Sequence, residues 1–339
     1  MRYFGIVFLA LCLFSCDDDS VVPPTAIDIS GGDILVLNEG GFQKGNASIG
    51  LYNTLNNTYD EKVFFAKNQI LVGDVLQQAA SVNGEYWLVL NNSGKIIVVD
   101  STDLSIKQEI TGLTSPRYIV FSDKGKRAYI SDLYADEITI VSTTNYSILN
   151  RVPLDGWTDQ MALIGDEVFI ANRAHGYVYI LNITSETITD SIAIANNPNT
   201  LTQLRSGKLA VLCEGKLGSN EDAQLQIIDP ISKTVTNNLT FPSNITPSLL
   251  RESPINGNLY CTFKGLHYIH PVDFTYQKKV IDLPTANIYG FDIDPVTGNI
   301  FLADARDYVQ PSEVYVYKNA SELKHKFTAG VICSGFIFK

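Results

Sequence analysis

The sequence has 339 residues, and its formal net charge of −11 gives it an isoelectric point of about 4.8. A chain this acidic lacks the basic face that the phosphates of a nucleic acid require, so we expect no nucleic-acid partner. Its length suits one large domain or two small ones.

The chain begins with the features of an export signal. Met1 and Arg2 give a short positive start, and residues 6–14 form an apolar run. The run is too short for a membrane-spanning helix, which needs about 20 apolar residues, so we interpret it as part of a signal peptide. Residues 13–16 resemble a bacterial lipobox, in which Cys16 becomes the acylated first residue of the mature protein. The alternative is an ordinary secretory signal that happens to contain a cysteine.

Three carboxylates, Asp17, Asp18 and Asp19, follow the predicted lipidation site. This run resembles the surface-export signal of Bacteroidota lipoproteins, which implies a position on the outer membrane facing the cell exterior. A solvated acidic spacer is the alternative. We predict a signal peptide over residues 1–15, an acylated cysteine and flexible tether over 16–30, and a single domain over 31–339 that meets the membrane only through its lipid.

The remaining cysteines are Cys213, Cys261 and Cys333, and each lies in an apolar segment. Their odd number and apolar surroundings predict buried thiols rather than a disulfide framework. One pair could still form a bridge, because the cell surface is oxidising.

Along the domain, residues that favour strands are abundant and no segment has a convincing helical period. One pattern recurs: an apolar strand that ends in a polar residue, a short loop, a second apolar strand, a turn and a third strand. Its copies begin at residues 34–38, 87–91, 128–132, 168–172, 209–213, 259–263 and 300–304. The six intervals between Asn38 and Asp304 give a mean period of about 44 residues, which is the spacing of propeller blades.

A fourth strand precedes most copies of the pattern, for example at residues 117–121, 160–164 and 290–294. The first copy has no such strand before it, and the missing one follows the seventh copy at residues 335–338. We therefore predict an all-β, seven-bladed β-propeller closed by pairing of the C-terminal strand into the first blade.

Two sets of loops are expected on one face of this propeller: those that lead into the innermost strands, and those that join the second strand of a blade to the third. The first set supplies the ligand-binding candidates Gln77, Arg117, Trp157, Asp159, Asn199 and Tyr289, and the second supplies Phe42, Tyr134, Arg173, His175, Arg306 and Tyr308. Trp, Tyr and Arg are enriched in recognition sites. Trp157 could instead pack between blades, and simple packing at a blade edge explains Phe42 and Tyr134 equally well.

Residues 115–131 resemble the repeat of YVTN/YncE-like propellers, and residues 37–42 and 45–49 resemble the start of a group of Bacteroidota surface lipoproteins. The resemblance covers nearly the whole domain. Within that group are lipoproteins that capture vitamin B12 and related corrinoids and pass them to a TonB-dependent outer-membrane transporter. The resemblance thus implies a corrinoid ligand, bound by hydrogen bonds and stacking, and a transporter partner.

Three classes of function remain at this point. The leading hypothesis is a surface protein that captures a corrinoid, and the long loops at residues 39–48, 214–223 and 305–313 predict a cleft for it. The second is a protein-interaction scaffold of an outer-membrane complex with no small ligand. The third is an enzyme, such as a lactonase or a quinone-dependent dehydrogenase. The sequence lacks the common catalytic and metal-binding motifs, so we expect no catalytic residues, no metal site and no cofactor.

Overall fold

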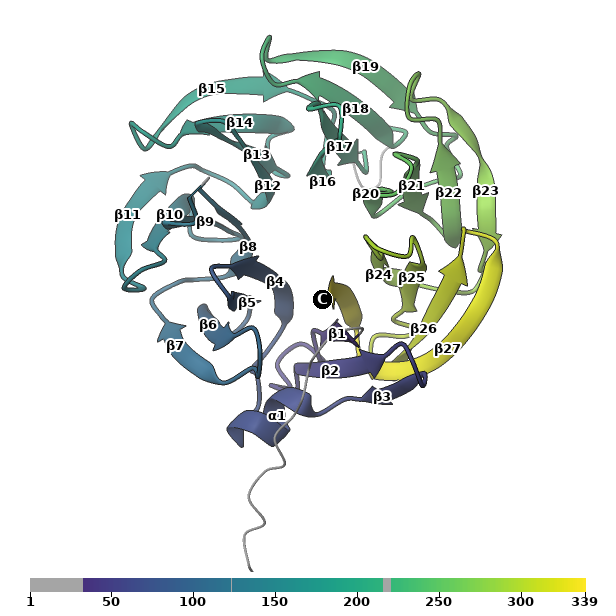
Figure 1. Ribbon diagram of the computed structural model, residues 1–339. Coiled ribbons are helices and arrows are strands. Elements are labelled where there is room, and N and C mark those ends of the chain that lie inside the picture. The colour runs from purple at the N-terminus through teal and green to yellow at the C-terminus, as the bar shows by residue number, and fades with distance from the viewer. Residues whose placement is uncertain (1–32, 123, 216–220) are drawn as a thin grey trace, which may run out of the picture.

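The computed structural model describes residues 33–122, 124–215 and 221–339. Within them, seven four-stranded antiparallel sheets surround a central opening, as Figure 1 shows. The predicted seven-bladed propeller is confirmed. The predicted signal peptide, Cys16 and the tether lie outside the described residues.

Each blade runs from an inner strand at the central opening to an outer strand at the rim (Figure 1). The inner strands are β4 (Leu76–Val82), β8 (Pro116–Phe121), β12 (Thr158–Ile164), β16 (Pro198–Gln203), β20 (Leu250–Glu252), β24 (Ile288–Ile293) and β28 (Cys333–Phe338). The second strands are β1 (Asp33–Asn38), β5 (Glu85–Leu90), β9 (Arg127–Asp132), β13 (Glu167–Asn172), β17 (Leu209–Cys213), β21 (Leu259–Thr262) and β25 (Ile300–Asp304).

The third strands are β2 (Ser48–Asn53), β6 (Lys95–Asp100), β10 (Glu137–Ser142), β14 (Tyr177–Asn182), β18 (Gln224–Asp229), β22 (Gly265–Ile269) and β26 (Pro311–Lys318). The outer strands are β3 (Thr58–Asp60), β7 (Ile106–Ile110), β11 (Ile148–Pro153), β15 (Thr187–Ala193), β19 (Thr234–Thr240), β23 (Tyr276–Asp282) and β27 (Glu322–Val331).

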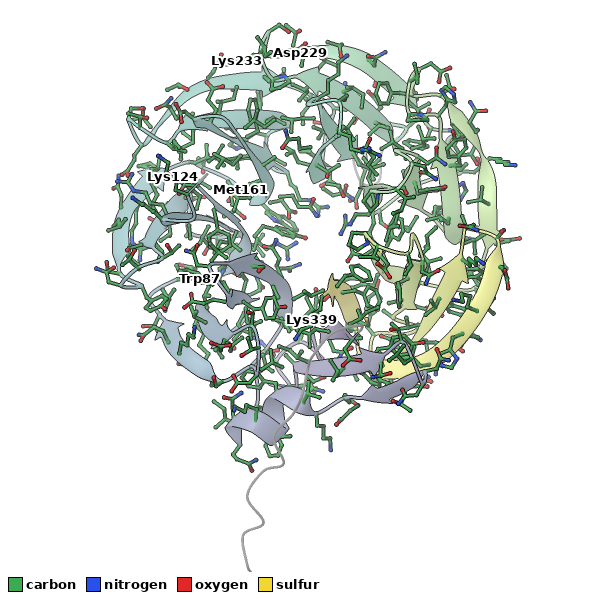
Figure 2. All side chains as sticks on the ribbon, viewed as in Figure 1. Trp87, Lys124, Met161, Asp229, Lys233 and Lys339 are labelled. Atoms are coloured by element: carbon green, nitrogen blue, oxygen red, sulfur yellow. The ribbon has the colours of Figure 1, made fainter. Side chains whose placement is uncertain are left out.

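The hydrophobic core lies between neighbouring blades. The second strands read as continuous apolar runs because both of their faces pack against other sheets, and all six residues of β5 are buried. The outer strands face solvent on one side, so β19 alternates between exposed and partly buried residues. Between the second and third blades, Trp87 is fully buried against Val98 and Ile130, and Figure 2 shows it inside its blade.

The ring closes through the first blade. β28 pairs antiparallel with β1, with Leu35 opposite Ile337 and Val36 opposite Phe336. The chain ends therefore form one sheet, as predicted from the missing strand at residues 335–338. The Phe336 ring lies 5.2 Å from that of Phe301 in the seventh blade, measured between centroids, so the closing strand also packs on its neighbour.

Two smaller features complete the fold. A six-residue helix, α1 (Val63–Asn68), connects the first blade to the second, although no helix was predicted, because so short a segment shows no helical period in the sequence. In the part of the chain that is described, no helix is long and apolar enough to cross a membrane. Cys213, Cys261 and Cys333 are buried free thiols, as expected.

Replacing Phe336 with Ala should lower the free energy of unfolding by about 3 kcal/mol, because it removes a buried ring from the closing strand. Urea denaturation measures the change. Leu323→Ala, on the exposed surface of β27, is the control and should cost less than about 1 kcal/mol. Equal losses in the two variants would show that the closing strand does not depend on this contact.

Candidate functional site

A cavity of about 510 Å³ lies in the central channel, where the inner strands of the seven blades meet. Side chains of the inner strands extend into the opening in Figure 2. Most of the cavity wall is polar, and its polar residues are Glu39, Gln77, Gln78, Arg117, Tyr118, Asp159, Gln160, Arg173, Asn199, Thr202, Glu214, Ser248, Arg251, Tyr289, Asp292 and Ser334.

A repeated backbone contact holds these residues in place. In six blades, the residue that follows the second strand donates its N–H to the carbonyl of the residue just before an inner strand, at 2.8–3.0 Å. Glu39 bonds to Ile332 in this way, and Arg173 bonds to Trp157. The two loop sets predicted to share one face are thus joined by hydrogen bonds at the mouth of the channel.

β-Bulges then turn side chains toward the channel. The register shifts at the start of six inner strands, for example between Leu76 and Gln78 in β4 and between Pro116 and Ile119 in β8. A bulge leaves one residue without a ladder partner and redirects its side chain. In β4 and β8 the residues at the shift include Gln77 and Arg117, and both line the cavity.

Asp159 sits at the centre of an ionic network on one wall. Its side chain is 1% exposed and lies between two guanidinium groups, at 3.6 Å from Arg117 and 3.5 Å from Arg173. Arg173 also binds Glu214 at 2.8 Å, and Glu214 accepts a hydrogen bond from Asn199 at 2.6 Å. Burial raises the pKa of Asp159, and the two arginines oppose that shift.

Trp157 lies against both arginines of this network. Its ring is 4.5 Å from the guanidinium carbon of Arg173 and 5.6 Å from that of Arg117. A guanidinium within about 6 Å of an indole face is attracted to it electrostatically. Trp157 is half-buried and borders the cavity wall through these two arginines rather than lining the cavity itself.

Glu39 occupies a different part of the wall. Its side chain is 5% exposed, and its Oε2 accepts a hydrogen bond from the Tyr289 hydroxyl at 3.1 Å. Burial raises the pKa of Glu39 to about 7, while the charge of Arg117 and the Tyr289 hydrogen bond act to lower it. This carboxyl group therefore changes charge near neutral pH.

The predicted candidates divide into two groups. Gln77, Arg117, Asp159, Arg173, Asn199 and Tyr289 line the cavity together, and Trp157 borders it. The other five candidates lie outside the cavity. The side chains of Phe42 and Tyr134 are 64% and 71% exposed. His175 lies 3.6 Å from Asp155, Arg306 lies 3.5 Å from Glu313, and Tyr308 packs edge-on against Tyr289.

Two acidic residues of the cavity, Glu39 and Glu214, are missing from the predicted set. Both follow a second strand directly, and both precede a glycine with a φ of +76° (Gly40 and Gly215). A side chain at either glycine would approach backbone atoms to within 2.6 Å. The repeated Glu-Gly pair after the apolar strand was thus a usable signal. Arg251 and Asp292, which pair at 2.7 Å, are also missing from the predicted set.

Among residues 33–122, 124–215 and 221–339, no group of three or more His, Cys, Asp or Glu side chains is placed to hold a metal ion.

Residues 32–329 match a family described as a domain of unknown function, DUF5074. The chain belongs to the DUF5074 family. No curated protein matches the sequence.

Solved structures that resemble this DUF5074 propeller are varied. A quinoprotein alcohol dehydrogenase-like protein from Bacteroides thetaiotaomicron superposes with a TM-score of 0.71 at 12% identity, over 92% of this chain and 79% of that one. A functionally unknown protein from Desulfotomaculum acetoxidans gives 0.68 at 11% identity, over 90% and 98%. The dihydro-heme d1 dehydrogenase NirN gives 0.61 at 11%, over 89% and 68%. At these identities the likeness shows the fold alone.

The Glu39→Gln variant should be more stable than the wild type above pH 7. The pKa of Glu39 is about 4.5 in the unfolded chain, and burial raises it to about 7 in the folded protein. The wild type therefore loses stability as the pH rises from about 4.5 to 7, and it stays less stable at higher pH. Because Gln cannot ionise, the gain should reach about 3 kcal/mol at alkaline pH and shrink as the pH falls. Urea denaturation at several pH values measures it, and a variant that is less stable at every pH would contradict the expectation.

Proposed function

We propose that this DUF5074 propeller captures a polar small molecule in its central cavity and catalyses no covalent reaction. The observation that carries the proposal is the set of buried polar atoms around the cavity without a hydrogen-bond partner among the described residues: Glu39 Oε1, Arg117 Nε, Asp159 Oδ1 and Asn199 Oδ1. Buried polar atoms are rarely left unbonded, so such a cluster favours a site that a ligand or ordered water completes. The cavity volume also falls within the roughly 300–1,000 Å³ that ligand pockets occupy.

The ionic network supports a preorganised binding site. Asp159, Glu214 and Asp292 each lie beside an arginine. The same pairs fix the positions of several hydrogen-bonding groups, which is what a preorganised binding site requires.

A corrinoid is our first candidate for the ligand. It is a broad macrocycle edged with amides, and the cavity wall presents the complementary side chains of Gln77, Gln78, Gln160 and Asn199. Because the cavity is too small to enclose the whole macrocycle, the ring would lie over the mouth near Trp157, with some of its amide arms in the channel. The resemblance to corrinoid-capturing lipoproteins points to the same ligand.

We further propose that the protein is a lipoprotein of the outer membrane that faces the cell exterior and serves a TonB-dependent transporter. This rests on the lipobox-like residues 13–16 and the acidic residues 17–19. A protein-interaction scaffold is the second candidate function. The exposed rings of Phe42 and Tyr134 favour it, because their loops lie on the face where the channel opens and could contact a partner protein.

Cyanocobalamin mixed with the purified protein should co-elute with it after desalting, at close to one molecule per chain. Trp157→Ala and Arg117→Ala should each weaken binding by about 1–3 kcal/mol, because each removes an anchoring group at the cavity. Tyr134→Ala, which changes an exposed ring outside the cavity, is the matched control and should bind as the wild type does.

A protein peak without corrin absorbance would exclude tight corrinoid binding and would leave capture of another polar molecule to be tested. Corrinoid binding that is unchanged in both cavity variants but lost in Tyr134→Ala would place the site on the exposed loops instead.

Cys16→Ala should move the protein from the membrane fraction to the soluble fraction of the cell, because the predicted acylated residue is removed. Fractionation followed by immunoblotting measures the change, and digestion of intact cells with protease tests exposure at the surface. Membrane association that survives the substitution would contradict lipid anchoring at this residue.

A further inference from the structure

The charged residues that line the cavity do not balance. The wall carries four carboxylates, Glu39, Asp159, Glu214 and Asp292, and three arginines. Arg173 lies within ion-pair distance of Asp159 and Glu214, Arg117 also pairs with Asp159, and Arg251 pairs with Asp292. Glu39 forms no ion pair with a described residue, which makes it the cavity carboxylate without a cationic partner.

The polar neighbours of Glu39 leave the charge of its carboxylate only partly balanced. Arg117 of β8 is near enough to act on its charge but beyond ion-pair distance, and it is already engaged by Gln77 and Asp159. The Tyr289 hydroxyl of β24 donates to Oε2.

The remaining ionisable neighbours are Tyr118 of β8 and Cys333 of β28. Burial raises the pKa of both groups, so both are neutral near pH 7 and neither repels the carboxylate of Glu39.

One oxygen of Glu39 is left for a ligand. Oε1 is buried and has no hydrogen-bond partner among the described residues. The last torsion of a glutamate side chain is soft, so the carboxylate can adjust to a ligand in the cavity that Glu39 lines. Glu39 itself is held firmly, because its N–H donates to Ile332 and its carbonyl accepts from Val75.

We propose that the cavity takes a ligand that carries a protonated amine, and that Glu39 binds this ammonium group through Oε1. The proposal rests on the capture of a polar molecule by the cavity, and it names a ligand class other than a corrinoid, because the amides of a corrinoid carry no positive charge. An ammonium group would donate a hydrogen bond to Oε1. Its positive charge would balance the excess negative charge of the cavity wall. The amides and hydroxyls of the wall would then bind the uncharged polar groups of the same ligand.

Binding should be linked to a proton. Burial raises the pKa of Glu39 to about 7, so the empty site is partly protonated at neutral pH. An ammonium group binds the ionised form, and Glu39 therefore releases its proton as the ligand enters. Affinity should rise with pH through this range. A neutral ligand that accepts a hydrogen bond from the protonated carboxyl would show the opposite dependence.

The test compares glucamine with sorbitol, two polyols that differ by one ammonium group in place of a hydroxyl. Isothermal titration calorimetry with the purified full-length protein at about pH 6 and pH 8 measures both affinities. We expect glucamine to bind at least about tenfold more tightly than sorbitol at the higher pH, and this preference to fall about tenfold at the lower pH.

Three variants test whether Glu39 causes the preference for glucamine and its pH dependence. Glu39→Gln should abolish the preference for glucamine and its pH dependence. Tyr289→Phe keeps the carboxylate but removes a hydrogen bond that stabilises its charge, so the preference should persist with its midpoint at a higher pH. Asp307→Asn removes the same charge from an exposed loop and is the matched control, expected to behave as the wild type does.

Equal affinity for the two polyols, a preference that survives in Glu39→Gln, or an affinity for glucamine that rises as the pH falls would each overturn the proposal. Binding of neither polyol would overturn it as well. Capture of a polar molecule by the cavity would still stand if cyanocobalamin binds, so failure of the amine assignment is distinguishable from failure of the proposed function.

Discussion

The structure depends on the pairing of β28 with β1. Each blade packs on two neighbours. A row of blades therefore leaves an exposed sheet face at each end unless the last blade packs against the first. Here the two ends of the domain form one sheet, and the hydrogen bonds of that sheet convert a row of seven blades into a closed ring. Without this pairing the first and seventh blades would expose their apolar faces to water.

Closure of the ring leaves the inner edge of every blade facing the channel without a further strand. The chain satisfies several of these edges with side chains from the neighbouring blade. Gln78 accepts from the Ile119 N–H at 2.8 Å, and Gln160 accepts from the Leu201 N–H at 3.1 Å. The polar character of the cavity wall is thus partly a consequence of the architecture, because backbone groups at the channel need partners. Charged groups that are not required as partners of the backbone, Glu39 above all, are the ones that point to a ligand.

The sequence predicted the architecture well because strand spacing and apolar runs are properties of each blade by itself. The strand at residues 335–338 could be assigned to the first blade because only that blade lacked one. Within the site, Arg117 and Asp159 were predictable because they begin inner strands. Phe42 was chosen in place of Glu39 because sequence spacing cannot show where the chain turns: Gly40, at a φ of +76°, directs the following loop away from the channel. The pairing of Arg251 with Asp292 joins two blades and has no signature in either segment.

The two tryptophans of the chain occupy opposite environments. Trp87 is sealed in the core between two blades, whereas Trp157 lies half-buried against two guanidinium groups at the mouth of the channel. Indole emission depends on the polarity and charge around the ring. Light emitted by Trp87 therefore reports on the packing of its two blades, while that from Trp157 should change when its two arginines move. The protein thus carries its own optical probe at the mouth of the cavity.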